Sequence, residues 1–241
     1  LVGWGEASPW PVFTGSVEGT AAALDVYFRP VVVGQNPTHI TKVMAATDAV
    51  LVGHFEAKAA LEMALYDLVG KAAGLPVAEL LGGRCRDRIP LSISLANPDF
   101  AADLELAKLV YADGLRILKV KTGFADHQFD LKRLQGLREE LPEDMDIRVD
   151  YNQGMTPFEA LGRLRDVEIF QPGFIEQPVP GKEWKTMTEL TAKLDTPVLA
   201  DESVFSPNDA LRAAENRIAN CFSIKVMKSG GMRRGQEIAA V

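Results

Sequence analysis

Three carboxylates recur at a regular interval in the second half of the chain. Asp150, Glu176 and Asp201 each close a short apolar run, and successive carboxylates stand roughly 25 residues apart, about one per βα unit of a barrel. If the runs are parallel strands, these side chains converge at one edge, where they repel each other without a cation between them. An all-oxygen set of donors favours a hard divalent ion, Mg²⁺ or Mn²⁺.

Lysines accompany the carboxylates. Lys119 and Lys121 are two positions apart in one apolar run, so on a strand both point to the same face, and Lys225 falls in the last run. A neighbouring lysine and a metal ion both favour the neutral amine, which lowers the lysine pKa toward a value suited to a base. Two lysines that face each other can remove a proton from one side of a carbon and return one on the other.

The elements that must position these residues begin near residue 89. Apolar runs at 89–95, 117–121, 147–150, 174–176, 198–201 and 222–226 alternate with amphipathic stretches at 100–112, 127–141, 157–164, 184–193 and 207–214. This alternation predicts an α/β fold with a parallel sheet and helical crossovers. Charged residues at five successive strand ends favour a TIM-type barrel over a doubly wound sheet, whose site lies only near its switch point.

The segment before residue 89 has a different pattern. Helical periodicity predicts helices at 16–28, ending before Pro30, at 40–49 and at 55–73, while residues 1–7 read as the end of a strand. The chain has no initiator Met, and its last helix has no cap, so we expect a fragment of a longer protein.

Composition excludes several classes of protein. Acidic residues outnumber basic ones by 33 to 26, for a net charge of −7, which argues against a nucleic-acid partner. No apolar run reaches the ~18–20 residues that span a membrane. Cys85 and Cys221 form no metal or redox motif, so we expect reduced core thiols in a cytoplasmic protein.

Taken together, the motifs resemble the enolase superfamily, in its muconate lactonizing enzyme subgroup. The matching segments are KVK at 119–121, DYNQ at 150–153, IEQP at 175–178, ADES at 200–203, IKVMKSGG at 224–231, and the helix 57–68 followed by LLGG at 80–83. The resemblance implies a partial α+β capping domain with its connecting helix at residues 1–88. It also implies a partial, modified eight-fold barrel of about six βα units at residues 89–241.

The same resemblance implies roles for individual residues and a Mg²⁺ (or Mn²⁺) cofactor. In a mandelate racemase-type relative a His would be the second base, so Lys225 favours the lysine-pair subgroup. The implied metal ligands are Asp150, Glu176 and Asp201; the implied acid/base residues are Lys121 and Lys225, with Lys119 as electrostatic partner; and the implied supports of the ligands are Asn152 and Glu202.

The expected reaction is proton abstraction α to the carboxylate of a small molecule, by a lyase or isomerase. Phe13 and Thr14, in a stiff loop at 8–15, and Ser94 are candidate substrate contacts, and the small hydroxyl favours a small amino-acid-like acid. A cis-3-hydroxyproline dehydratase or a related epimerase is the first expectation, with dipeptide epimerase and muconate cycloisomerase open. A Schiff-base aldolase and a non-catalytic barrel are the alternatives from other classes. We also expect a homo-oligomer.

Overall fold

The structure is a computed structural model that describes residues 1–241, the whole printed sequence. The chain divides into two compact units. The first comprises Leu1–Asp87, Phe205–Asn208 and Ile224–Val241, and the second comprises Arg88–Val204 and Asp209–Ser223. The domain boundary expected between residues 88 and 89 stays a prediction. No helix combines the length and the apolar character needed to cross a membrane.

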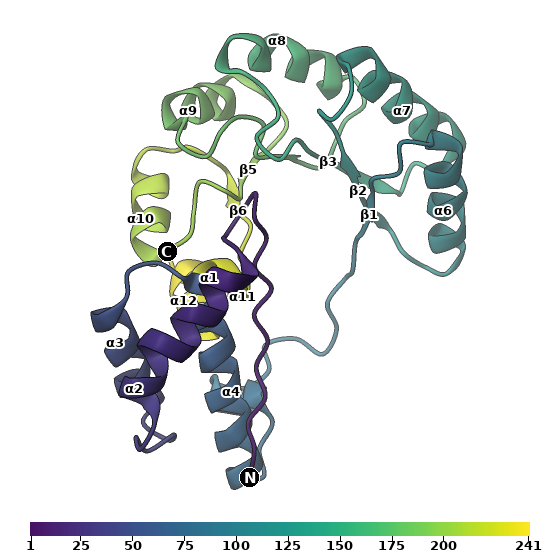
Figure 1. Ribbon diagram of the computed structural model, residues 1–241. Helices are drawn as coiled ribbons and strands as arrows, with labels where there is room; N and C mark the ends of the chain where they lie inside the picture. Colours follow the sequence, from purple (N-terminus) through teal and green to yellow (C-terminus); the bar gives the residue numbers. More distant parts are fainter. The chain divides into compact units, whose positions relative to one another are not determined.

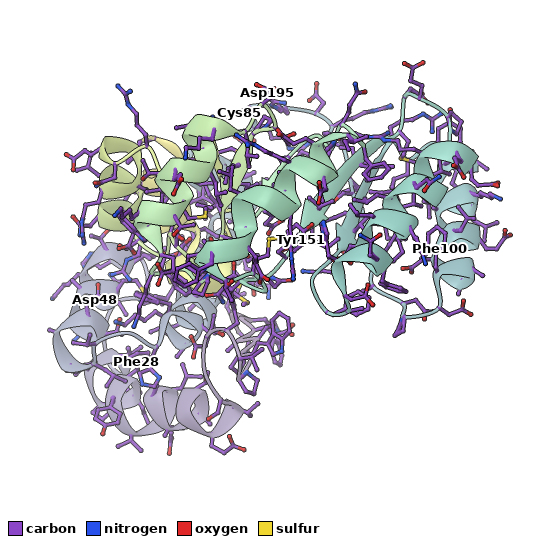
Figure 2. The ribbon with its side chains drawn as sticks, turned by 90° about the horizontal axis from the view of Figure 1, so that it is seen from above. Phe28, Asp48, Cys85, Phe100, Tyr151 and Asp195 are labelled. Atoms are coloured by element: carbon purple, nitrogen blue, oxygen red, sulfur yellow. The ribbon has the colours of Figure 1, made fainter.

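Helices make up most of the first unit. They are α1 (Val17–Ala22), the π-helical turn η1 (Ala23–Phe28), α2 (Arg29–Val32), α3 (Ile40–Val50), α4 (Phe55–Ala73), α5 (Val77–Leu80), α11 (Val226–Ser229) and α12 (Met232–Ala239). Phe28 is buried in a small apolar cluster with Ala23 and Ala57, and Figure 2 labels it within the first unit. The helices predicted at 40–49 and 55–73 are therefore present within a residue of their expected bounds.

The first helical region continues past the stop that the sequence suggests. Ser16 Oγ accepts a hydrogen bond from the Gly19 N–H at 3.1 Å and caps the start of α1. Pro30 lies in the first turn of α2, where proline is best tolerated in a helix. The predicted end before Pro30 is therefore wrong, because η1 connects α1 directly to a new helical turn that tolerates proline.

The first ten residues run beside α4 without forming a strand, contrary to expectation (Figure 1). A Cβ atom on Gly3 would lie 2.1 Å from the Ala64 carbonyl oxygen, and one on Gly5 would lie 1.9 Å from that of Ala60. Only glycine permits so close an approach of the two backbones. The alternation of these two glycines therefore fixes which side of the segment meets the helix.

The second unit carries the parallel sheet. Its elements are β1 (Ile93–Leu95), α6 (Phe100–Ala112), β2 (Ile117–Lys121), α7 (His127–Glu140), β3 (Asp146–Asp150), α8 (Pro157–Glu168), β4 (Ile175–Glu176), α9 (Trp184–Lys193), β5 (Val198–Ala200), α10 (Pro207–Glu215) and β6 (Cys221–Phe222). All strands are parallel, in the order β1-β2-β3-β4-β5-β6. Figure 1 shows helices α6 to α10 along the convex side of this curved sheet. The predicted α/β sheet of six units is confirmed.

Alternation along the strands separates an apolar from a polar face. On β2, Leu118 and Val120 are completely buried, whereas Lys119 and Lys121 on the opposite face retain some exposure. On β3, Ile147 and Val149 are buried in the same way. Because successive side chains of a strand point to opposite faces, burying the aliphatic residues directs the lysines to the other face of the sheet.

From the sequence, both cysteines are expected to be reduced and to lie in the core. Both thiols are free, but Cys85 is exposed and Cys221 is half-buried (Cys85 is labelled in Figure 2). Cys85 is therefore no core thiol, because it lies in an irregular segment between α5 and β1 that carries no buried apolar residue around it.

Candidate active site

Strand register places the candidate residues of the second unit side by side. Lys121 of β2 is in register with Asp150 of β3, and Asp150 is in register with Glu176 of β4. All three are the last residues of their strands, and Asp201 directly follows β5. In-register neighbours of a parallel sheet point to the same face, so these side chains line its carboxyl edge.

Both lysines of β2 contact the carboxylates. Lys119 Nζ lies 2.9 Å from Asp150 Oδ2 and 3.1 Å from Glu176 Oε2. Lys121 Nζ lies 2.6 Å from the same Asp150 oxygen and donates a short hydrogen bond to Asn152 Oδ1. Asp150 therefore accepts two ammonium groups while having no exposure to solvent. Charge-assisted hydrogen bonds of this length are among the stronger ones in proteins.

Burial and neighbouring charge raise the pKa of the Glu176 carboxyl. The side chain is almost completely buried, which penalises the charged form, and the negative charges of Asp150 and Asp201 act in the same direction. Lys119 opposes this shift only in part. Glu176 Oε1 has no hydrogen-bond partner. A buried carboxylate oxygen without a donor is an unusual arrangement, and a bound cation would satisfy it.

The carboxylates around Lys119 favour its charged form. Burial acts to lower the pKa of its ammonium group, but the Asp150 and Glu176 carboxylates outweigh that effect and raise the pKa. The lowered lysine pKa expected from the sequence assumes a bound metal ion, so it stays a prediction.

Asn152 links the lysine to the loop after β5. Its backbone has a φ of 41°, and its N–H donates to Asp150 Oδ1 at 3.0 Å. Its side-chain amide accepts from Lys121 and donates to Glu202 Oε1 at 3.2 Å. Burial, followed by the negative charge of Asp201, raises the pKa of the Glu202 carboxyl. The Asn152 amide thus orients both the Lys121 amine and the Glu202 carboxyl group, which lie beside the predicted metal ligands.

The donor chemistry of this edge fits Mg²⁺. Asp150, Glu176 and Asp201 are buried carboxylates, and hard divalent ions prefer such oxygen ligands. As the side chains stand, no three His, Cys, Asp or Glu residues converge tightly enough to enclose an ion. Lys119 and Lys121 both contact Asp150 Oδ2, whereas Asp150 Oδ1 accepts from the Asn152 N–H. Asp150, Glu176 and Asp201 would hold the ion, with the two ammonium groups beside it.

The remaining candidates lie on other elements. Ser94 of β1 is in register with Lys119, so it points to the same face of the sheet, and it is exposed. Lys225, Phe13 and Thr14 belong to the first unit. Lys225 directly precedes α11, and its Nζ lies 4.8 Å from the centroid of the Phe13 ring. Thr14 Oγ1 accepts from the Trp10 N–H at 3.1 Å and so stabilises its own turn.

Sequence reasoning missed Gln177, which is completely buried directly after Glu176. Its side-chain amide bonds to the loop that carries Asp201. Its signals were its place in the IEQP segment at 175–178 and its position beside a charged strand end, but a polar residue at such a place is usually solvated.

A curved parallel β/α sheet with carboxylates and lysines at its carboxyl edge defines a protein of the TIM-barrel class. Two family models then cover most of the chain: the mandelate racemase / muconate lactonizing enzyme N-terminal domain matches residues 1–82, and the enolase C-terminal domain-like model matches residues 102–241. The chain therefore belongs to the enolase superfamily, with the muconate lactonizing enzyme-like proteins, as its motifs predict.

Individual relatives within this family are epimerases and a muconate cycloisomerase. Over all of its length the chain is 35% identical to the L-Ala-D/L-Glu epimerase of Bacillus subtilis, of which it spans 66%. It is 48% identical to a muconate cycloisomerase structure from Azorhizobium caulinodans, with a TM-score of 0.90, covering 99% of this chain and 65% of that one. It is 31% identical to a dipeptide epimerase from Enterococcus faecalis V583 complexed with Mg and the dipeptide L-Leu-L-Tyr, with a TM-score of 0.92 and coverage of 99% and 67%.

Proposed function

We propose that the protein is a Mg²⁺-dependent isomerase that removes the proton α to a carboxylate, and that it acts as a dipeptide epimerase. The observation that carries the proposal is the array of Lys121, Asp150 and Glu176 at the ends of three adjacent strands, with Lys119 two residues before Lys121. The similarity to epimerases of L-Ala-D/L-Glu and of dipeptides supports the choice of substrate. These relatives favour epimerisation over the dehydration of cis-3-hydroxyproline that the sequence first suggested.

In the proposed reaction, Asp150, Glu176 and Asp201 would hold Mg²⁺, which offsets the negative charge that develops on the substrate carboxylate. Lys121 moves the α-proton at its Nζ, and Asn152 holds that amine in place by a hydrogen bond. Lys119 keeps a positive charge against Asp150 and Glu176. Lys225 takes the opposing acid/base role that the family resemblance implies, so that a proton removed on one face is returned on the other.

A second candidate is muconate cycloisomerase, which the similarity to the Azorhizobium caulinodans structure favours. The same residues serve it, with one lysine moving the proton. The Schiff-base aldolase, with Lys121 or Lys225 as nucleophile, is less well supported, because it needs no metal ion and leaves the buried carboxylates of Asp150, Glu176 and Asp201 without a role.

The deciding experiment offers the protein L-Ala-L-Glu, L-Leu-L-Tyr and cis,cis-muconate in separate assays. Deuterium uptake from D₂O at the α-carbon, followed by mass spectrometry, should occur with a dipeptide, stop after EDTA treatment and return with Mg²⁺. Lys121→Ala should lower the rate by ~10²–10⁴-fold. Lys193→Ala, which changes an exposed lysine paired to Glu189, should leave the rate unchanged.

Three outcomes would count against the proposal. Turnover of muconate without dipeptide exchange would select the second candidate. Full exchange after EDTA treatment would exclude the metal-dependent mechanism. A stable adduct after borohydride treatment with substrate would indicate a Schiff base instead.

A further inference from the structure

Gln177 is a completely buried polar residue placed between two strand ends that carry carboxylates. It directly follows Glu176 of β4, and its own φ is 30°, in the left-handed region that non-glycine residues rarely adopt. Its backbone N–H donates to the Leu199 carbonyl of β5 at 2.9 Å, and its carbonyl accepts from the Gln153 N–H at 2.8 Å. The backbone of Gln177 therefore connects the ends of β3, β4 and β5.

Both the oxygen and the nitrogen of the Gln177 side-chain amide form hydrogen bonds. Gln177 Oε1 accepts from the Asp201 N–H at 2.9 Å and from the Ser203 N–H at 3.2 Å. Gln177 Nε2 donates to the Val179 carbonyl and to Ser203 Oγ, each at 2.9 Å. A neutral amide is suited to this place, because it supplies an acceptor on one side and two donors on the other.

These contacts fix the loop that holds Asp201 against the strand end that holds Glu176. Asp201 directly follows β5, and the hydrogen bond from its backbone N–H to Gln177 Oε1 ties this backbone to the residue that follows β4. Residues that hydrogen-bond to the groups around a metal orient the ligands and are part of the site.

We propose that Gln177 is a positioning residue of the metal site, whose amide fixes the loop that carries Asp201 against the strand end that carries Glu176, the two carboxylates that would hold Mg²⁺. The inference rests on the proposed function, because it requires that Glu176 and Asp201 bind the ion. It goes beyond that function in assigning the geometry of the ligands to a side chain that contacts neither metal nor substrate.

Isothermal titration calorimetry of Mg²⁺ into the protein without substrate tests the proposal. Gln177→Met keeps a buried side chain of similar length but removes every hydrogen bond of the amide. We expect it to weaken Mg²⁺ binding by ~10–100-fold. Unchanged Mg²⁺ affinity in a folded Gln177→Met protein would overturn the proposal.

A matched control separates positioning from general stability. Leu164→Ala empties a completely buried site on α8 and lowers the melting temperature through a cavity, but it changes no group at the strand ends. It should keep the wild-type Mg²⁺ affinity. If Leu164→Ala weakened Mg²⁺ binding as much as Gln177→Met, the effect would be one of stability, and the positioning role would be lost.

A second variant covers the case in which Gln177→Met does not fold. Ser203→Ala removes the hydroxyl that accepts from Gln177 Nε2 and leaves the backbone bond to Ser203 intact. It should weaken Mg²⁺ binding less than Gln177→Met but measurably, and wild-type affinity would contradict the proposal. Failure of the wild-type protein itself to bind Mg²⁺ would instead contradict the proposed metal-dependent function.

Discussion

Asp201 and Glu202 are neighbours in the sequence, but the structure gives them different surroundings. Asp201 is completely buried, and its backbone N–H is bound to Gln177. Glu202 Oε1 accepts from the Asn152 amide, which in turn contacts Lys121. Asp201 lies at a bend directly after β5 and Glu202 in the turn that follows, so their different hydrogen-bond partners, and not strand alternation, distinguish the expected ligand from its neighbour.

We predict that Asp201→Asn and Glu202→Gln separate metal binding from turnover. Asp201→Asn removes a ligand charge and should weaken Mg²⁺ binding by more than ~10-fold. Glu202→Gln keeps an acceptor for Asn152 and should leave Mg²⁺ affinity near wild type while it lowers turnover. Calorimetry and the deuterium-exchange assay measure the two effects. The reverse pattern, with binding lost only in Glu202→Gln, would exchange the assigned roles.

At the scale of elements, helix α7 joins the ends of β1 and β2 through a buried guanidinium group. Arg133 donates to the Lys121 carbonyl at 2.7 Å and to Asp103 Oδ2 of α6 at 2.7 Å. Asp103 also accepts from the Asn97 N–H in the loop after β1. Arg133 and Asp103 are both almost completely buried. The backbone of Lys121 is therefore fixed from behind by a helix.

Arg133→Met should destabilise the second unit by about 3–5 kcal/mol, because it leaves the Asp103 carboxylate buried without its partner. Arg133→Met combined with Asp103→Leu removes both charges. The double variant should lose less unfolding free energy than the sum of the losses in the two single variants. Urea unfolding followed by circular dichroism supplies the four values of a double-mutant cycle. A coupling energy below about 0.5 kcal/mol would mean that the pair acts independently and the assignment is wrong.

Glu62 of α4 serves as the cap of another helix in the first unit. Its Oε2 accepts from the Met232 N–H at 2.5 Å and from the Arg233 N–H at 3.3 Å, at the start of α12. The preceding Gly231 has a φ of 141°, and a Cβ atom there would lie 2.3 Å from Glu62 Oε2. Burial raises the pKa of the Glu62 carboxyl, even though the two N–H groups and Arg234 act to lower it.

This raised pKa predicts a pH dependence of stability. The folded chain holds the Glu62 proton more tightly than the unfolded chain, whose Glu pKa is 4.5. The contribution of Glu62 to stability is therefore full below that value and is lost as the pH rises through the raised folded pKa. In Glu62→Gln the side chain should still cap α12, and the loss of stability with rising pH should be absent. Melting temperatures of both proteins from about pH 4 to pH 8 check the difference, and parallel curves would refute it.

At the scale of the whole molecule, bound Mg²⁺ should act as a stabilising ligand. An ion that binds only the folded chain adds about 2.7 kcal/mol when its free concentration is 100 times its Kd. Calorimetric melting should shift upward with Mg²⁺ in the wild-type protein and not in Asp201→Asn. A NaCl solution of the same ionic strength is the control. An equal shift in Asp201→Asn would place the bound ion elsewhere.

Much of the sheet can be predicted from the sequence, because apolar residues alternate along the strands and charged residues mark the strand ends. The run 117–121 predicts β2 to the residue, since Leu118 and Val120 alternate with two lysines. The last runs agree less well: the expected strand at 222–226 is Cys221–Phe222, after which the chain turns and α11 begins at Val226. Apolar residues continue there, and only their tertiary surroundings decide between strand and helix.

The site shows the same division between local and non-local information. Asp150 and Glu176 are predictable, because each ends an apolar run and strand ends meet at one edge. The pairing of Lys119 with both of them depends on register across three strands, which no single run contains. Gln177 depends on a loop that follows a different strand, so its role could not be inferred from its own segment.

The sequential order of the strands has a consequence for synthesis on the ribosome. Every strand pairs with the one made just before it, so β3 can join β2 as soon as Asp150 has emerged, and Glu176 and Asp201 then arrive in the order in which they are translated. The first unit behaves in the opposite way. Glu62 waits for Met232, 170 residues later, before α12 is capped. Of the two units described, the one whose helices are translated earlier is therefore completed later.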